Sequence, residues 1–213
     1  MAQTSPYPAI AAPYGLKPIN LIGGQVFAGA TRQLPITTSS INYNTAIFNG
    51  DVVQLASSGT IIISTLDTDT SPVAGVVGVF LGCTYTNPVT KQLTFSQYWP
   101  GFASGVTDAQ AYIADDPDQL YKVVSVGDTA DGTGLVPVPL VQTTLGNNVV
   151  LVLNTGSTTT GNSRIGIYAN GVTTSLPMRV VDMVPDTETT TGFVEVIVKF
   201  NFGYHSYYNA TGV

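Results

Sequence analysis

The sequence predicts an all-β fold, a β-barrel or β-sandwich with an extended N-terminal arm and at most one or two short helices. Short apolar segments recur at spacings of about ten residues between turn signals, which is typical of sandwiches and barrels. No segment shows a sustained apolar period of 3.6 residues, the mark of an amphipathic helix. Residues 193–202 alternate instead, with Val194, Val196, Val198 and Phe200 on one face of the expected strand.

The first 22 residues are expected to form the arm, because proline recurs through them. Proline lacks an amide donor and is disfavoured in helix interiors and central strands. Apolar residues lie between the prolines and have no means of forming a core of their own. Such an arm is either disordered or lies along a neighbouring protein, and its aromatic content favours the second alternative. The prolines are Pro6, Pro8, Pro13 and Pro18, and a Gly23-Gly24 hinge follows them.

Strands separated by turns are expected from about residue 25 onward. They are rich in apolar and β-branched residues, and several follow a turn built from Gly, Ser, Asn or Asp, such as Asn49-Gly50-Asp51. Gly75 and Gly78 interrupt the most apolar of them, where a bulge or a close backbone approach is expected. A hairpin with an aromatic rim is expected over 84–101. The strands expected here are 26–28, 32–36, 52–55, 60–64, 73–81, 107–114 and 120–126.

The C-terminal part continues the same pattern. Two prolines confine the extended segment 136–140 to a sheet edge or a linker, and Asn170-Gly171 predicts a turn. Short helices fit only near 42–47 and 116–121; at the second, an Asp-Pro pair suits either a helix start or a tight turn. The remaining expected strands are 149–153, 165–169, 178–184 and 193–202.

A chain of 213 residues has room for one sizeable domain or two small ones. We expect the arm over residues 1–22, a β-barrel-like domain over 23–145 and a C-terminal β segment over 146–213. The last segment is either part of the same domain or a unit of its own.

The composition is unusual in its charge. Hydrophobic residues make up 44% of the chain and charged residues only 9%, with a net charge of −6. Ordinary globular domains carry about 25% charged residues. The polar surface must therefore consist of Thr, Ser, Asn and Gln, and we expect much of it to be buried against partners.

The same composition argues against several classes of protein. No cluster of Lys or Arg is present, so we expect no nucleic-acid partner. No apolar run reaches the roughly 18 residues of a membrane helix, so we expect no membrane partner. The first residues resemble no secretory signal, because they lack a basic start and an apolar stretch.

Catalytic chemistry has few candidate groups in this sequence. The single histidine, His205, lies in the aromatic tail, and the single cysteine, Cys83, follows an apolar run where a buried core residue is expected. The carboxylates that could form a glycosidase pair stand at no meaningful spacing. They are Asp182, Asp186, Glu188 and Glu195. We therefore expect no enzyme and no cofactor.

Two further groups of residues allow alternative interpretations. Asp115, Asp116 and Asp118 lack the glycine and the distal glutamate of a calcium loop, so a turn or a helix cap is favoured over a metal site. Aromatic residues around the expected hairpin could line a sugar-binding surface, but packing in the core or at a subunit interface is favoured. These aromatic residues are Tyr85, Tyr98, Trp99 and Phe102.

Several short motifs occur in a characteristic order along most of the chain. Residues 12–18 read APYGLKP, 48–53 read FNGDVV, 73–79 read VAGVVGV, 111–118 read AYIADDPD, and the chain closes on ATGV after a histidine in an aromatic stretch. With these motifs the sequence resembles the small virion proteins of tailed phages that are called capsid decoration or cement proteins. A looser likeness links it to lambda-type head decoration proteins, which combine a similar β-barrel with an N-terminal arm. This chain is larger, which implies an elaborated barrel or a second β-subdomain.

The resemblance implies a structural role on the outer surface of an icosahedral phage capsid. The expected partner is the major capsid protein, and the expected assembly is a homotrimer at three-fold sites. The arm would make the contacts, through Tyr7, Pro8, Pro13, Tyr14, Leu16 and Pro18. The main alternative is another virion component, such as a head fibre, a tail protein or a receptor-binding protein. A major shell protein would need a long spine helix that the sequence lacks, and a glycan depolymerase would need a carboxylate pair.

Overall fold

The part of the chain that the structure describes forms twelve β-strands in two antiparallel sheets, which confirms the all-β prediction. The computed structural model describes residues 13–37, 45–66, 75–102, 105–127, 136–172, 175–187 and 192–213, without the side chains of 169–172. Within these ranges the only helical elements are three 3-10 turns: η1 (Gln142–Thr144), η2 (Pro185–Thr187) and η3 (Ser206–Tyr208).

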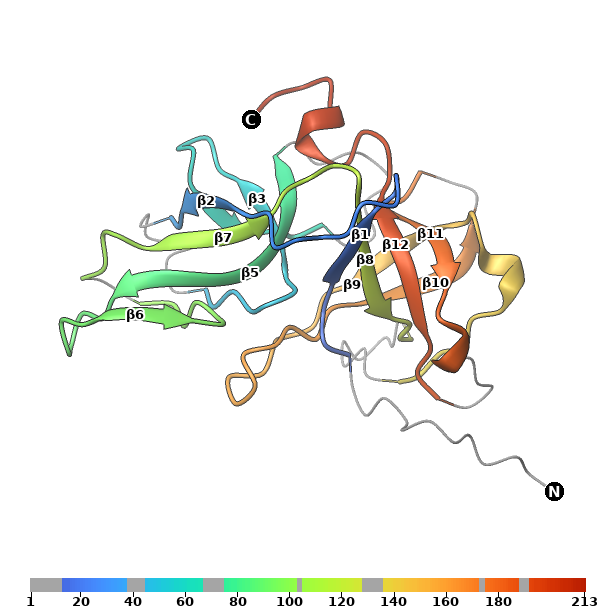
Figure 1. Ribbon diagram of the computed structural model, residues 1–213, viewed down its shortest axis with the longest axis horizontal. Coiled ribbons are helices and arrows are strands. Elements are labelled where there is room, and N and C mark those ends of the chain that lie inside the picture. Colours follow the sequence, from blue (N-terminus) through green and yellow to red (C-terminus); the bar gives the residue numbers. More distant parts are fainter. Residues whose placement is uncertain are drawn as a thin grey trace.

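The first sheet, called sheet I, has six strands, and Figure 1 shows it on the right. After β8 the chain runs beside β10, where Val126 N donates to Ile167 O at 2.8 Å and Ser125 bridges Ile167. Sheet I therefore curls toward closure as a small barrel. Its strand order is β1 (Lys17–Leu21), β8 (Gln119–Val124), β12 (Glu195–Phe200), β11 (Met178–Met183), β9 (Asn148–Val152) and β10 (Gly166–Val172).

The second sheet, called sheet II, has its strands β5, β6 and β7 extending away from sheet I in Figure 1. Strand β5 is the longest and pairs with β7 on one side and with β3 and then β6 on the other. The order is β2 (Arg32–Pro35), β7 (Gln110–Ala114), β5 (Val76–Thr86), β3 (Val52–Leu55) and β4 (Ile61–Ile63), with β6 (Leu93–Ser96) beside β5.

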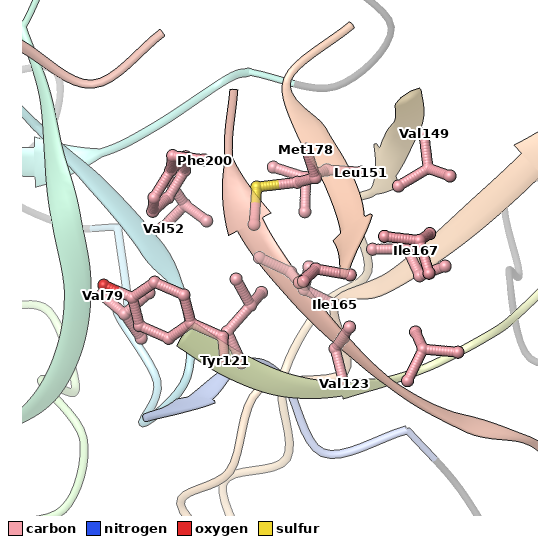
Figure 2. Close-up of a cluster of buried hydrophobic side chains, with 14 of the residues drawn as sticks. Val52, Val79, Tyr121, Val123, Val149, Leu151, Ile165, Ile167, Met178 and Phe200 are labelled. Carbon is pink, nitrogen blue, oxygen red and sulfur yellow. The ribbon is translucent and has the colours of Figure 1, made fainter. Parts of the chain in front are cut away.

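Two hydrophobic cores hold the sheets. The first fills the inside of sheet I and continues between the sheets, where Tyr121, Met178 and Phe200 meet Val52 and Val79 of sheet II (Figure 2). The alternation predicted for 193–202 is confirmed, because its four predicted core-facing side chains are buried in this core. The second core covers the other face of sheet II and includes Phe80, Cys83 and Trp99.

Strand β5 contributes to both cores because successive side chains point to opposite faces of a sheet, and a kink at Gly78 shifts that alternation by one residue. Gly78 has φ +151°, and a Cβ there would lie 2.1 Å from the carbonyl oxygen of Ala114. The register with β3 shifts at the same place. After the kink, Val79 packs in the first core and Phe80 in the second. The close backbone approach expected at Gly78 is confirmed.

Three local predictions had different outcomes. Residues 116–118 form a tight turn, one of the two alternatives expected there, in which the Asp116 side chain accepts from Asp118 N at 2.8 Å before β8 begins. Near 42–47, only residues 45–47 are described, and they form no helix. Asn170-Gly171 lies within β10, where the register shifts, and not in a turn.

The segment boundaries expected from the sequence do not match the way in which the strands are distributed between the two sheets. Residues 17–21, expected in the arm, form β1 at the edge of sheet I and pair with β8. Strand β8, expected in the domain over 23–145, lies between β1 and β12. Sheet I thus contains residues from all three expected segments. The expected boundary near residue 145 therefore does not coincide with the division between sheet I and sheet II.

Candidate functional site

The predicted contact residues of the arm fall into two groups. Tyr7 and Pro8 lie outside the described residues. From Pro13 onward the chain is part of the fold: Pro13 and Leu16 are buried, and Tyr14 and Pro18 are half-buried. Leu16 is fully buried in the first core. In this conformation Leu16 holds the arm to the fold and offers no surface to a partner.

A close backbone approach fixes this attachment. Leu16 N donates to Gly50 O at 3.0 Å. Gly15 has φ +80°, and a Cβ there would lie 2.6 Å from Cβ of Ser163 and 2.8 Å from Gly50 O. The segment 14–17 therefore lies against the loop before β3 and the loop before β10, and we call this meeting point the junction. It connects the arm with both sheets.

Tyr14 anchors the junction to sheet I. Its hydroxyl donates to Oε1 of Glu195 at 2.5 Å, and Lys122 Nζ lies 3.1 Å from the same oxygen. Burial, and then the hydrogen bond and charge of Glu195, raise the pKa of Tyr14 far above its usual range. Lys122 also lies 5.8 Å from the centre of the Tyr14 ring. Glu195, a candidate carboxylate in the sequence, is thus engaged in an anchoring network.

Lys17 joins the junction to sheet II. Its Nζ donates to Oδ1 of Asn49, and lies 3.1 Å from Oδ1 of Asn162. The Asn49 amide nitrogen donates to Leu81 O at 2.6 Å. Burial lowers the pKa of Lys17, while the charge of Asp51 opposes that shift.

Asp51 is the buried acid of the junction, with 1% of its surface exposed. Burial raises its pKa to about 6, although hydrogen bonds from the Ser163 side chain and Phe48 N, and the charge of Lys17, act in the opposite direction. Phe48 N donates to its Oδ2 at 2.7 Å. Beside it lies a pocket of about 450 Å³ whose lining includes Ile63 and Ile165.

No signal in the sequence identified this junction. Asn49-Gly50-Asp51 predicts a turn, which the bond from Asp51 N to Phe48 O at 2.9 Å bears out. The partners of that turn come from positions far away in the chain, so their contact has no local pattern. The close approach of Gly15 and Gly50 requires glycine at both positions. A glycine in the sequence, however, does not indicate which distant segment will lie against it.

A second cluster lies where the C-terminal tail meets the turn after β7. Tyr207 Oη donates to Asp115 Oδ2 at 2.7 Å, and Arg32 forms an ion pair with the same oxygen at 2.9 Å. Lys199 pairs with Asp118 at 2.6 Å. Two of the three acidic residues singled out in the sequence, Asp115 and Asp118, are therefore bound to a cation and a tyrosine each, and Asp116 accepts from Asp118 N. In the part of the chain that the structure describes, no three His, Cys, Asp or Glu side chains gather as metal ligands.

His205 is buried beneath this tail, with none of its surface exposed. Its Nδ1 accepts from Tyr207 N at 3.3 Å and so caps the turn η3. The proton of the neutral ring is therefore on Nε2. Burial lowers the pKa of His205, against the opposing effect of the charges of Asp115 and Asp116.

Three of the four aromatic residues expected at the hairpin, Tyr85, Trp99 and Phe102, pack in or against the second core. Trp99 and Tyr85 are buried and meet edge to face at 5.2 Å, and Phe102 packs against both. Tyr98 stacks on Phe48 at 5.3 Å. The buried rings offer no platform for a sugar. Cys83 is buried among them as expected, which raises its pKa to about 12.

The exposed apolar side chains gather in part on the β5–β6 hairpin. Val89, Leu93 and Phe95 are 85%, 62% and 72% exposed. Leu93 and Phe95 are two positions apart in β6 and point to the same face. Among the described residues, β6 pairs only with β5 and leaves its other edge open. This is a neutral, apolar sheet edge, of the kind that other chains can cover.

Comparison of the chain with protein-family models, curated proteins and solved structures found no match. Within the described ranges, no helix has the length and apolar character that crossing a membrane requires.

Proposed function

We propose that this chain is a virion structural protein that decorates the outer surface of an icosahedral phage head and stabilises it. The partner is the major capsid protein, and the decorating unit is a homotrimer. The motifs that resemble those of capsid decoration proteins suggest this proposal. The junction is the structural observation that carries the proposal.

The junction gives the arm a fixed point of attachment. Leu16 is buried, and Tyr14 and Lys17 are bonded to opposite sheets. The contacts of Tyr14, Leu16 and Lys17 with both sheets therefore resist a force that is applied to the chain before Pro13. A segment that holds a protein to a shell needs an anchor of this kind.

The surface is consistent with an assembly. Charged residues are only 9% of the chain, while Leu93 and Phe95 stand exposed on an open strand edge. A trimer on a repeating shell makes several weak contacts at once, and multivalency raises their combined strength. Neighbours in such an assembly cover neutral and apolar surface that a free monomer exposes.

Truncation tests the role of the arm, and the structure determines where to cut. Removing residues 1–22 would delete β1 and the junction, so loss of binding would report misfolding. Removing residues 1–12 keeps Pro13 and everything after it. We expect the shorter deletion to preserve the fold and the trimer but to abolish co-sedimentation with phage heads that lack this protein.

Full decoration by the protein without residues 1–12 would contradict the role of the arm. Binding of the intact protein to host cells or glycans, with no binding to heads, would favour a fibre, tail or receptor-binding component instead. Light scattering of the free protein gives the subunit number and checks the trimer separately.

A further inference from the structure

The junction brings the amine of Lys17 against the carboxamide of Asn49, with the buried Asp51 two residues further along the same loop. Lys17 begins β1 of sheet I, whereas Asn49 and Asp51 lie in the loop before β3 of sheet II. The Lys17 amine contacts the carboxamide oxygen of Asn49. The bond from Asn49 Nδ2 to Leu81 O, at 2.6 Å, orients that carboxamide with its oxygen toward the lysine.

Lys17 differs from two other lysines of the protein in its surroundings. Lys122 and Lys199 each form an ion pair with a carboxylate. Among the described residues Lys17 forms none, and it is directed instead at the carboxamides of Asn49 and Asn162. An amine that is held against a carboxamide and bound to no carboxylate is placed for nucleophilic attack once it loses its proton.

We propose that Lys17 and Asn49 form an intramolecular isopeptide bond, assisted by Asp51, that joins the two sheets covalently. The inference does not depend on the proposed function. It assigns the junction a covalent modification made by the chain on itself.

The reaction balances without any further reagent. The free amine of Lys17 attacks Cγ of Asn49, and a new C–N bond forms as the bond from Cγ to Nδ2 breaks. One proton from the attacking nitrogen passes to the departing nitrogen, which leaves as ammonia. Nothing is oxidised or reduced.

Asp51 is the acid that can relay this proton. It is almost fully buried, two residues from Asn49, and its charge acts on Lys17. Burial moves the pKa of Asp51 up to about 6 and that of Lys17 down. Both shifts favour the neutral forms, an uncharged amine and a protonated acid, that aminolysis of an amide requires.

Asn49 is the favoured acceptor over Asn162. The Asn162 oxygen also accepts from Gln97 Nε2 at 2.8 Å, so Lys17 shares it with a second donor. Asn162 therefore serves to position the amine. A Lys17–Asn49 bond would tie the start of β1 to the loop before β3 and would fix the arm to both sheets.

Intact-mass spectrometry of the purified, full-length protein tests the proposal directly. We expect a mass lower than that calculated from the sequence by one ammonia molecule. Trypsin cleaves after Arg32, between the two residues, so tandem spectra should show peptides joined through Lys17 and Asn49.

Three substitutions should abolish the loss of ammonia: Lys17→Arg, Asn49→Ala and Asp51→Asn. Asn162→Ala should retain it, as should Lys199→Arg, which alters a lysine paired with an aspartate elsewhere. A wild-type protein with its full calculated mass would overturn the proposal, whether or not any variant folds. A bond to Asn162, or its formation in Asp51→Asn, would also overturn it.

Discussion

The hydroxyl of Tyr14 lies 2.5 Å from Oε1 of Glu195, and this contact joins residues 181 positions apart in the chain. Glu195 begins β12, in the middle of sheet I, and Lys122 of the neighbouring β8 binds the same carboxylate. The contact therefore attaches the start of the described chain to the outward face of the central strands of sheet I.

Removing this hydroxyl should destabilise the fold. Tyr14→Phe leaves the ring in place and deprives a nearly buried carboxylate of one donor, which should cost about 1–3 kcal/mol. Urea denaturation of Tyr14→Phe, Glu195→Gln and the double variant gives the coupling energy between the two residues. Purely additive effects would mean that the two groups do not interact in solution.

The close approach at Gly15 should tolerate no side chain. Gly15→Ala should lower the free energy of unfolding by more than about 2 kcal/mol, because the new Cβ would overlap the backbone of Gly50 and because alanine is strained at this positive φ. Gly24 has nearly the same φ, +83°, but nothing within 4 Å of a Cβ. Gly24→Ala is thus a matched control for strain alone and should cost about 1 kcal/mol. Equal losses in the two variants would show that Gly15 is not tightly packed.

Asp51 should make the fold less stable as the pH rises. Its pKa is about 6 in the folded protein against 3.8 ordinarily, so between these values the folded state binds more protons than the unfolded state. The free energy of unfolding should fall by roughly 3 kcal/mol across that window. Asp51→Asn should remove this slope in denaturation curves recorded at several pH values. An unchanged slope in the variant would contradict a raised pKa at Asp51.

His205 should have the opposite dependence. Its pKa is lowered in the folded protein, so the unfolded state binds the proton first, and stability is lost as the pH falls below about 6.5. Protonation of Nδ1 also removes the acceptor for Tyr207 N and uncaps η3. We expect the protection of amides in the peptide 203–213, measured against the intrinsic exchange rate at each pH, to fall in mild acid.

His205→Asn is the control, because asparagine can accept the same bond and does not titrate. The tail of this variant should keep its protection at low pH. An equal loss of protection in both proteins would show that another group controls the tail.

The sequence predicted best those features that depend on local alternation and burial. Val196, Val198 and Phe200 face the core as their spacing indicates, and Cys83 is buried among apolar neighbours. The fold class followed from the same signals. Periodicity reports which face of a strand is apolar, and in this chain most apolar faces are covered.

Features that depend on distant partners could not be predicted. Pro18 suggested an arm, yet β1 is an edge strand, where a residue without an amide donor is tolerated. Asn170-Gly171 can form a hairpin turn or a bulge, and pairing with β9 determines which. The contact of Lys17 with Asn49 exists only because two sheets meet, so no spacing in the sequence could reveal it.

The central claim, attachment to the outside of a phage head through an arm anchored at the junction, is tested most directly by electron cryomicroscopy. Heads that lack this protein would be imaged alone, after addition of the full chain, and after addition of the chain without residues 1–12. We predict trimeric density on the outer surface at three-fold sites with the full chain, and bare heads with the truncated one. Bare heads with the full chain, or density confined to the tail, would contradict the account.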